Sequence, residues 1–173
     1  MAPVGPLTRP TADRVREALF SVLGDIADFR VLDLFAGTGA LGIEALSRGA
    51  AHATFVENAR PALRALGKNI HTLALEAATT VLPIAVERAL KTPPWKPEAF
   101  DLIFLDPPYA AVHGGRFTHA LGKAVARGLM SALRPEGRVI LEHASADSAP
   151  EVSGAALEAT RVYGDTALSF YLR

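Results

Sequence analysis

The chain has 173 residues, of which 50% are hydrophobic and 21% charged, as expected for one globular domain rather than a disordered chain. Its 18 basic and 18 acidic side chains cancel, so the net charge indicates neither nucleic acid nor an anionic membrane, and any phosphate-binding surface must be local. Cysteine is absent, which excludes disulfides, thiolate metal sites and thiol catalysis; with no signal sequence and no membrane-spanning apolar run, we expect a cytoplasmic protein.

The N-terminal region predicts an extended lead followed by a helix. Residues 1–10 carry three prolines, and Thr11 can cap the helix that follows. The inner face of this helix is formed by apolar residues at helical spacing, namely Val15, Ala18, Leu19, Val22 and Leu23. Arg9, Arg14 and Arg16 form the densest basic cluster of the sequence. Such arginines usually solvate a helix, but together they are candidates for contacts with phosphate.

A glycine-rich turn follows the first predicted strand. Residues 29–35 are mainly apolar and lead into Gly37-Thr38-Gly39-Ala40-Leu41-Gly42, after which a helix over residues 40–48 is closed by Gly49. Glycines permit a tight turn, and the backbone amides at the start of a helix attract electron-rich groups. Asp33, inside the strand, can bind a ligand or can accept hydrogen bonds from the amides of the glycine turn itself.

A second strand, over residues 53–56, ends in Glu57. A carboxylate in this place can accept both hydroxyls of a ribose, although a solvated strand end is the simpler interpretation. Asn58 is a candidate cap for the helix that comes next. The pattern then predicts a weak strand over residues 79–82 and a short helix over residues 83–90.

Asp106-Pro107-Pro108-Tyr109 stands at the end of a strongly apolar strand over residues 100–105. Because two prolines cannot donate to a sheet, these four residues must leave it at the strand's carboxyl end. A planar amino group conjugated to a ring needs acceptors for its hydrogens, and Asp106 with the carbonyl of Pro107 can provide two. Tyr109 can stack on the ring. The alternative is an ordinary buried strand ended by a proline turn.

The remaining segments complete an alternating pattern. They are a lid-like stretch at residues 110–115, a helix over 117–133 stopped by a turn at 134–137, a buried strand over 139–141 ended by Glu142 and His143, and two final strands from Leu157 joined at Gly164-Asp165. Strands that alternate with helices predict a single doubly wound α/β domain over residues 11–173. Its sheet should be mostly parallel, with an antiparallel hairpin at the C-terminal end.

Three segments, residues 31–42, 55–57 and 106–109, resemble the successive motifs of S-adenosylmethionine-dependent amino-methyltransferases. More narrowly, the Arg-Pro-Thr-Ala-Asp-Arg-Val-Arg-Glu-Ala-Leu-Phe opening at residues 9–20 is similar to that of the bacterial 16S ribosomal RNA guanine-N2-methyltransferase family (RsmD-like). The resemblance implies a Rossmann-like methyltransferase sheet with its first and fourth strands adjacent. It also implies methyl transfer from S-adenosylmethionine to N2 of a guanine in 16S ribosomal RNA, in an assembled or assembling small subunit, without a metal.

The same resemblance assigns site residues. Cofactor contacts fall on Asp33, Phe35, Gly37, Thr38, Gly39, Glu57, Asn58 and Ala85, the catalytic run on Asp106, Pro107, Pro108 and Tyr109, and RNA contacts on Arg9, Arg14 and Arg16. Asp33 and the glycine turn would hold the methionine portion, and Glu57 the ribose. Family members tend to carry an acid near the adenine after the third strand; here Ala85 offers only its amide. The family's basic lead before the opening is short here, and Lys123 with Arg127 is the alternative RNA-binding face.

Two other functions fit part of the pattern. An adenine-N6 methyltransferase can carry the same Asp-Pro-Pro-Tyr run, although many such enzymes have a separate target-reading domain. An oxidoreductase can carry Gly37-x-Gly39-x-x-Gly42 with Glu57, since this also satisfies the dinucleotide-binding pattern, but it needs neither Asp33 nor Asp106. A protein-glutamine methyltransferase is disfavoured because such enzymes prefer Asn at the position of Asp106.

Overall fold

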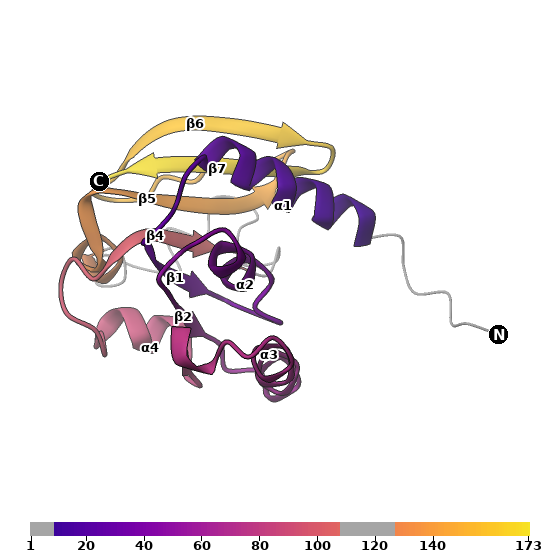
Figure 1. Ribbon diagram of the computed structural model, residues 1–173. Helices are drawn as coiled ribbons and strands as arrows, with labels where there is room; N and C mark the ends of the chain where they lie inside the picture. Colours follow the sequence, from indigo (N-terminus) through magenta and orange to yellow (C-terminus); the bar gives the residue numbers. More distant parts are fainter. Residues whose placement is uncertain (1–8, 108–126) are drawn as a thin grey trace.

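The computed structural model describes residues 9–107 and 127–173, which form a seven-stranded sheet with helices on both faces (Figure 1). The strand order is β3-β2-β1-β4-β5-β7-β6. The strands are β1 (Arg30–Leu34), β2 (His52–Val56), β3 (Thr79–Leu82), β4 (Phe100–Leu105), β5 (Leu133–Ala144), β6 (Ala156–Tyr163) and β7 (Thr166–Leu172). The first five run parallel, whereas β7 is antiparallel to β5 and β6. The predicted mostly parallel, doubly wound sheet with a closing hairpin is confirmed, including the adjacency of β1 and β4.

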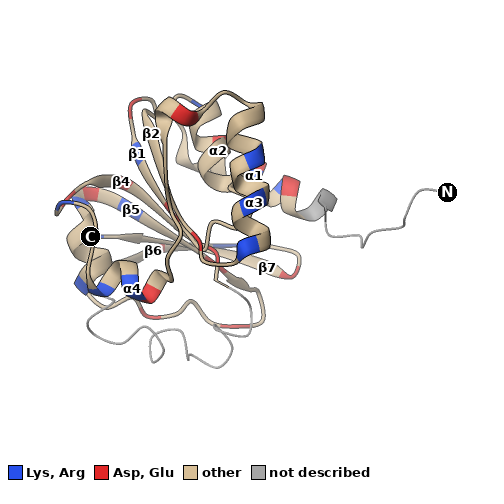
Figure 2. Ribbon diagram, turned by 90° about the horizontal axis from the view of Figure 1, so that it is seen from below, with Lys and Arg blue, Asp and Glu red and all other residues tan. Residues whose placement is uncertain are grey.

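Four helices and a helical segment cover the two faces (Figure 2). They are α1 (Arg9–Leu23), α2 (Ala40–Ser47), α3 (Arg60–Thr72), α4 (Val86–Lys91) and residues 127–132, with a 3₁₀ turn at Glu76–Ala78. Helices α1, α2 and α3 pack on the face that carries Val31, Phe55 and Phe104. Helix α4 and residues 127–132 pack on the face that carries Leu32 and Ile103. Burial of these two layers is the main source of stability.

The parallel register brings the carboxyl ends of the central strands to one edge of the sheet. Leu34 of β1 lies beside Leu105 of β4, and Leu105 lies beside Leu141 of β5. Phe35 and Asp106 therefore leave the ladder next to each other, and Glu142, which continues in β5, lies beside Asp106. Polar side chains at this edge therefore lie close together, at the edge where other open α/β sheets bind their ligands.

Several element boundaries differ from the sequence predictions. Helix α1 begins at Arg9 and not after Thr11, because Pro10 in a first turn loses no helical hydrogen bond. Helix α4 begins at Val86 and not at residue 83, since Ala85 has extended backbone angles (φ −66°, ψ 143°). The predicted turn at residues 134–137 lies inside β5, as an irregularity between the pairs Phe100–Leu133 and Leu102–Arg138. Of the predicted helix over residues 117–133, residues 127–132 are helical, while 117–126 and the lid stretch lie outside the described residues.

Candidate active site

A cavity of about 550 Å³ lies at the carboxyl edge of the sheet. Its walls come from the ends of β1, β2 and β4, from the residues after β3, and from the starts of α3 and α4. The lining residues are Phe35, Val56, Glu57, Asn58, Ala59, Ile84, Val86, Glu87, Asp106 and Pro107. The structure thus brings together five residues that the sequence analysis singled out from three distant segments: Phe35, Glu57, Asn58, Asp106 and Pro107.

Glu57 is held at the end of β2 by three backbone N–H groups. Gly37 donates to its Oε2 atom, and Asn58 and Ala59 donate to its Oε1 atom, each at 2.8 Å. The predicted cap for α3 is therefore wrong, because Ala59 is the N-cap and no side chain caps the helix. A carboxylate offers about four acceptor positions, so Glu57 retains capacity for a ligand hydroxyl.

Asp33 lies beneath the glycine turn, with 2% of its surface exposed. Its Oδ2 atom accepts a hydrogen bond of 2.9 Å from the N–H of Gly42, as one of the two interpretations of this residue predicts. Burial raises the pKa of Asp33 to about 7; the bond from Gly42 opposes this shift, and the charges of Asp106 and Glu57 add to it. A direct contact with the methionine portion of a cofactor stays a prediction.

The glycine turn adopts left-handed backbone angles, and at Gly39 a neighbouring side chain leaves no room for a Cβ atom. Gly37 and Gly39 have φ angles of +56° and +83°, and Phe35 before them is also left-handed at +63°, an uncommon conformation for a bulky residue. A Cβ on Gly39 would lie 2.4 Å from Cδ1 of Leu66. The carbonyl of Thr38 accepts a hydrogen bond of 3.0 Å from Asn69, which ties the turn to α3. The predicted cofactor contacts of these residues are not tested by this geometry.

Gly42 allows α2 to approach the sheet closely, and we expect Gly42→Ala to destabilise the fold. The new Cβ would lie 2.4 and 2.8 Å from ring atoms of Phe55 and 3.2 Å from Oδ2 of Asp33. Overpacking of this kind costs about 1–3 kcal/mol. Gly67→Ala is the matched control, because this exposed position in α3 has no atom within 4 Å and alanine there should stabilise by roughly 0.5–1 kcal/mol. Urea unfolding measures both; equal effects would show that the close approach at Gly42 is unimportant.

Asp106 directly follows β4, and Glu142 lies in the neighbouring strand β5, two residues before its end. The Asp106 side chain is reached by solvent, yet protein surrounds much of its carboxyl group, and this partial burial raises its pKa to about 6. Burial and the charge of Asp106 raise the pKa of Glu142 to about 7. The predicted strand end at Glu142 and His143 is wrong, because β5 continues to Ala144. The register between β4 and β5 places Glu142 beside Asp106, and the sequence alone gives no sign of this register. Pro108 and Tyr109 lie outside the described residues.

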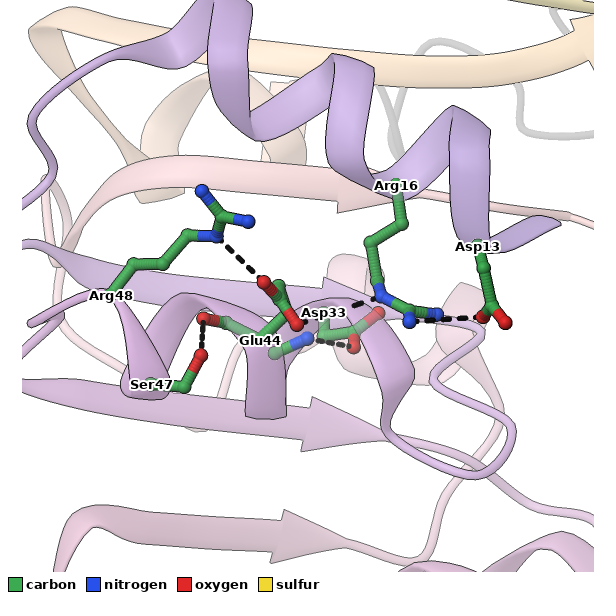
Figure 3. Close-up of polar contacts among 7 residues, drawn as sticks. Asp13, Arg16, Asp33, Glu44, Ser47 and Arg48 are labelled. Atoms are coloured by element: carbon green, nitrogen blue, oxygen red, sulfur yellow. Dashed lines mark hydrogen bonds and ion pairs between the residues drawn. The ribbon is translucent and has the colours of Figure 1, made fainter. Parts of the chain in front are cut away.

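The predicted arginine cluster is only partly available for a ligand (Figure 3). Arg16 pairs with Asp13 at 3.0 Å and with Glu44 of α2 at 3.6 Å, and Glu44 also holds Arg48 at 2.7 Å. Arg16 therefore joins α1 to α2. Arg14 is exposed and has no hydrogen-bond or ion-pair partner within residues 9–107 and 127–173. The side chain of Arg9 and all of Lys123 lie outside the described residues, whereas Arg127 begins the helical segment 127–132.

Ala85 is placed near the cavity but not in its wall. It is the N-cap of α4, where its carbonyl accepts hydrogen bonds from Arg88 and Ala89, and its neighbours Ile84 and Val86 line the cavity. Its role as an amide donor to adenine stays a prediction. In the described part of the chain no group of three or more His, Cys, Asp or Glu residues could hold a metal ion, and no helix is long and apolar enough to span a membrane.

The sheet, the glycine turn and the carboxylates at the ends of β2 and β4 define a Rossmann-like methyltransferase. A sequence profile of the family described as "Conserved hypothetical protein 95" matches residues 1–172, so the chain belongs to this family. A relative from Bacillus subtilis, "Putative rRNA methyltransferase YlbH", is 37% identical over 98% of this chain and 90% of its own length. "Ribosomal RNA small subunit methyltransferase D" of Escherichia coli K12 is 44% identical, but the match spans 62% of this chain and 52% of that protein.

Solved structures agree with this membership. "Putative methyltransferase yhhF from Escherichia coli" has a TM-score of 0.77 and 34% identity, over 99% of this chain and 90% of that one. A conserved hypothetical protein from Streptococcus pyogenes also has a TM-score of 0.77 and 34% identity, over 91% of this chain and 94% of that one. The likeness therefore extends over nearly the whole fold, including the strands that form the site.

Proposed function

We propose that the protein transfers a methyl group from S-adenosylmethionine to N2 of a guanine in 16S ribosomal RNA, presented in an assembled or assembling small subunit in the cytoplasm. The observation that carries this proposal is the position of Asp106 and Pro107, which end β4 and form a wall of the cavity that Glu57 also lines. The names of the relatives from B. subtilis and E. coli support ribosomal RNA as the acceptor. They give no support to an oxidoreductase.

The cavity suits the proposed cofactor. Val56, Ile84 and Val86 offer apolar wall for an adenine, and Glu57 retains acceptor capacity for ribose hydroxyls. We assign the methionine portion to Asp33 and the glycine turn, which the hydrogen bond from Gly42 to Asp33 supports from within the protein. When bound, S-adenosylmethionine supplies an electrophilic methyl group. The protein has only to hold the acceptor nitrogen in line with that group, and positioning of this kind is worth about 7–11 kcal/mol of the barrier.

The acceptor nitrogen is a poor nucleophile, because the lone pair of a guanine amino group is delocalised into the ring. Asp106 and the carbonyl of Pro107 would accept its two hydrogens and favour the tetrahedral geometry in which the lone pair is localised. Tyr109 would stack on the base once it is swung out of its loop. As the new N–C bond forms, the amino hydrogen becomes acidic, and in this proposal the carboxylate of Asp106 receives the proton.

The proposal that Arg9, Arg14 and Arg16 contact RNA phosphates has a test that separates Arg14 from Arg16. Arg14→Ala should weaken binding to small subunits and lower the salt slope by about 0.7–0.9, the contribution of one phosphate, without changing cofactor affinity. Arg16→Ala should mainly reduce stability, since Arg16 joins α1 to α2. Filter binding over a salt series and thermal unfolding measure these effects. A slope above about six on bare RNA, or full activity when all three arginines are alanine, would move the RNA-binding surface to the Lys123 and Arg127 face.

A further inference from the structure

Glu142 lies beside Asp106 on the neighbouring parallel strand. The register pairs Phe104 with Ile140 and Leu105 with Leu141, so Asp106 and Glu142 are the next two residues in step. Phe104 and Ile140 both pack on the face covered by α1. Because side chains alternate along a strand, Glu142 falls on that same face, two residues further toward the carboxyl edge, where Asp106 follows β4. The charge of Asp106 contributes to the raised pKa of Glu142, which agrees with this proximity.

Glu142 is on the side of Asp106 away from the cofactor cavity. The cavity is lined by residues from β1, β2 and β4 and by the residues after β3, and Glu142 is not among them. The order β1-β4-β5 places β4, with Asp106 at its end, between the cavity and Glu142. A base whose amino group reaches Asp106 from outside the cavity would therefore also meet Glu142. The carboxyl group of Glu142 is half-buried and has no hydrogen-bond or ion-pair partner within residues 9–107 and 127–173.

Two neighbouring carboxylates match the edge of guanine and not that of adenine. Guanine presents the N1–H group directly beside its N2 amino group, so two adjacent donors face outward. Adenine presents its amino group beside N1, which is a bare acceptor and would face the second carboxylate with like polarity. Sites that hydrogen-bond a substrate group discriminate strongly against an analogue that lacks it, because the buried partner is left unpaired.

We propose that Glu142 accepts the hydrogen bond from N1–H of the target guanine and so selects guanine as the base to be methylated. This inference rests on the function proposed above. The N1–H bond stays intact during the reaction: the N2–methyl bond forms, the methyl–sulfur bond breaks with its electron pair left on sulfur, and the proton lost from N2 goes to Asp106. Glu142 fixes the identity and orientation of the base and takes no proton from N2.

The test uses the full chain and small ribosomal subunits purified from cells that lack this protein. Glu142→Gln keeps an acceptor oxygen but loses the charge, so it should lower kcat/KM for N2-methylguanosine formation by about tenfold, while the Kd for S-adenosylmethionine and the Tm stay unchanged. Glu142→Asp keeps the charge and should retain more activity than Glu142→Gln. Glu136→Gln is the matched control, because Glu136 is exposed in the same strand at the opposite edge of the sheet.

A second measurement reports on base selection. Guanosine and 2-aminopurine riboside both carry the 2-amino group, but only guanosine has N1–H. As competitors of subunit methylation, guanosine should inhibit the wild-type protein at least about tenfold better. The preference should shrink for Glu142→Gln, since a glutamine amide can donate to the bare N1 of 2-aminopurine.

The outcomes separate the two proposals. If the wild-type protein forms no N2-methylguanosine, the proposed function and this inference fall together. If it does, and Glu142→Gln keeps nearly full kcat/KM or an unchanged preference between the two nucleosides, only the role of Glu142 is overturned. Failure of guanosine to compete at all would also count against the contact, because a base held by two carboxylates should be recognised outside its RNA.

Discussion

Asp106→Ala is expected to abolish methylation while leaving the affinity for S-adenosylmethionine nearly intact. Asp106 ends β4 at the border of the cavity, and in the proposed function it contacts the acceptor amine and not the cofactor. Loss of a group that accepts amino hydrogens and receives the proton should reduce the rate by about 100-fold or more. Isothermal titration with the cofactor and single-turnover methylation of small subunits measure the two quantities separately. Retention of most of the activity would remove Asp106 from the catalytic assignment.

Asp106→Asn and the pH dependence sharpen this prediction. An amide oxygen can accept one hydrogen bond but carries no charge, so the Asp106→Asn variant should have an intermediate rate.

The wild-type rate should rise as the pH passes through about 6, since the raised pKa of Asp106 means that its carboxylate, the form that accepts hydrogens, predominates only above that pH. The asparagine variant should lose this rise. A rise of equal size in both proteins would assign it to another group, with Glu142 the first candidate.

Glu57→Ala is expected to weaken binding of S-adenosylmethionine by about 10- to 150-fold, the range for one charge-assisted hydrogen bond. Turnover at saturating cofactor should change little, because Glu57 would contact the ribose and not the reacting atoms. The variant also removes the acceptor for the N–H groups of Gly37, Asn58 and Ala59, so its Tm should fall. Isothermal titration below the lowered Tm gives the Kd.

The matched control for Glu57 is Glu87→Ala. Glu87 lines the same cavity from the first turn of α4, but no contact with Gly37 or with the start of α3 depends on it. Its removal changes the charge of the cavity by the same amount and should leave the Kd closer to that of the wild type. An equal loss in both variants would show that net charge and not a specific ribose contact governs affinity, and Glu57 would then be only the anchor of the glycine turn.

The features that the sequence predicted are those that local pattern determines. The apolar run over residues 100–105 and the glycines from Gly37 to Gly42 define a strand and a turn without reference to the rest of the chain. The polar residues that end those strands then meet because parallel strands align their carboxyl ends. For this reason Glu57 and Asp106 could be assigned to one site from separate motifs, whereas Phe35 was assigned by the family resemblance.

The features that the sequence missed depend on distant partners. Asn58 was the better cap by residue type, but the helix begins one residue later, with Ala59 as its N-cap, and Glu57 accepts hydrogen bonds from the N–H groups of Asn58 and Ala59. Arg16 is of a residue type that usually faces solvent or binds RNA. Its ion pair with Glu44 can be predicted only when it is known that α1 and α2 pack on the same face of the sheet. The place of Glu142 beside Asp106 depends on a register that begins after an irregularity in β5. Pattern within a segment carries no information about such contacts.

The position of β7 has a consequence for how the chain folds as it is made. β7 lies between β5 and β6 in the sheet, although it follows both in sequence, and six of its seven residues are buried. Until residues 166–172 have left the ribosome, the backbone edge of β5 that pairs with β7 has no partner, and β6 has no neighbouring strand. The half of the sheet around β1 and β4 can form during translation, whereas the half that contains Glu142 must wait for a late strand to enter between two earlier ones. Completion of this sheet is therefore a late event that depends on contacts distant in sequence, the kind that form slowly.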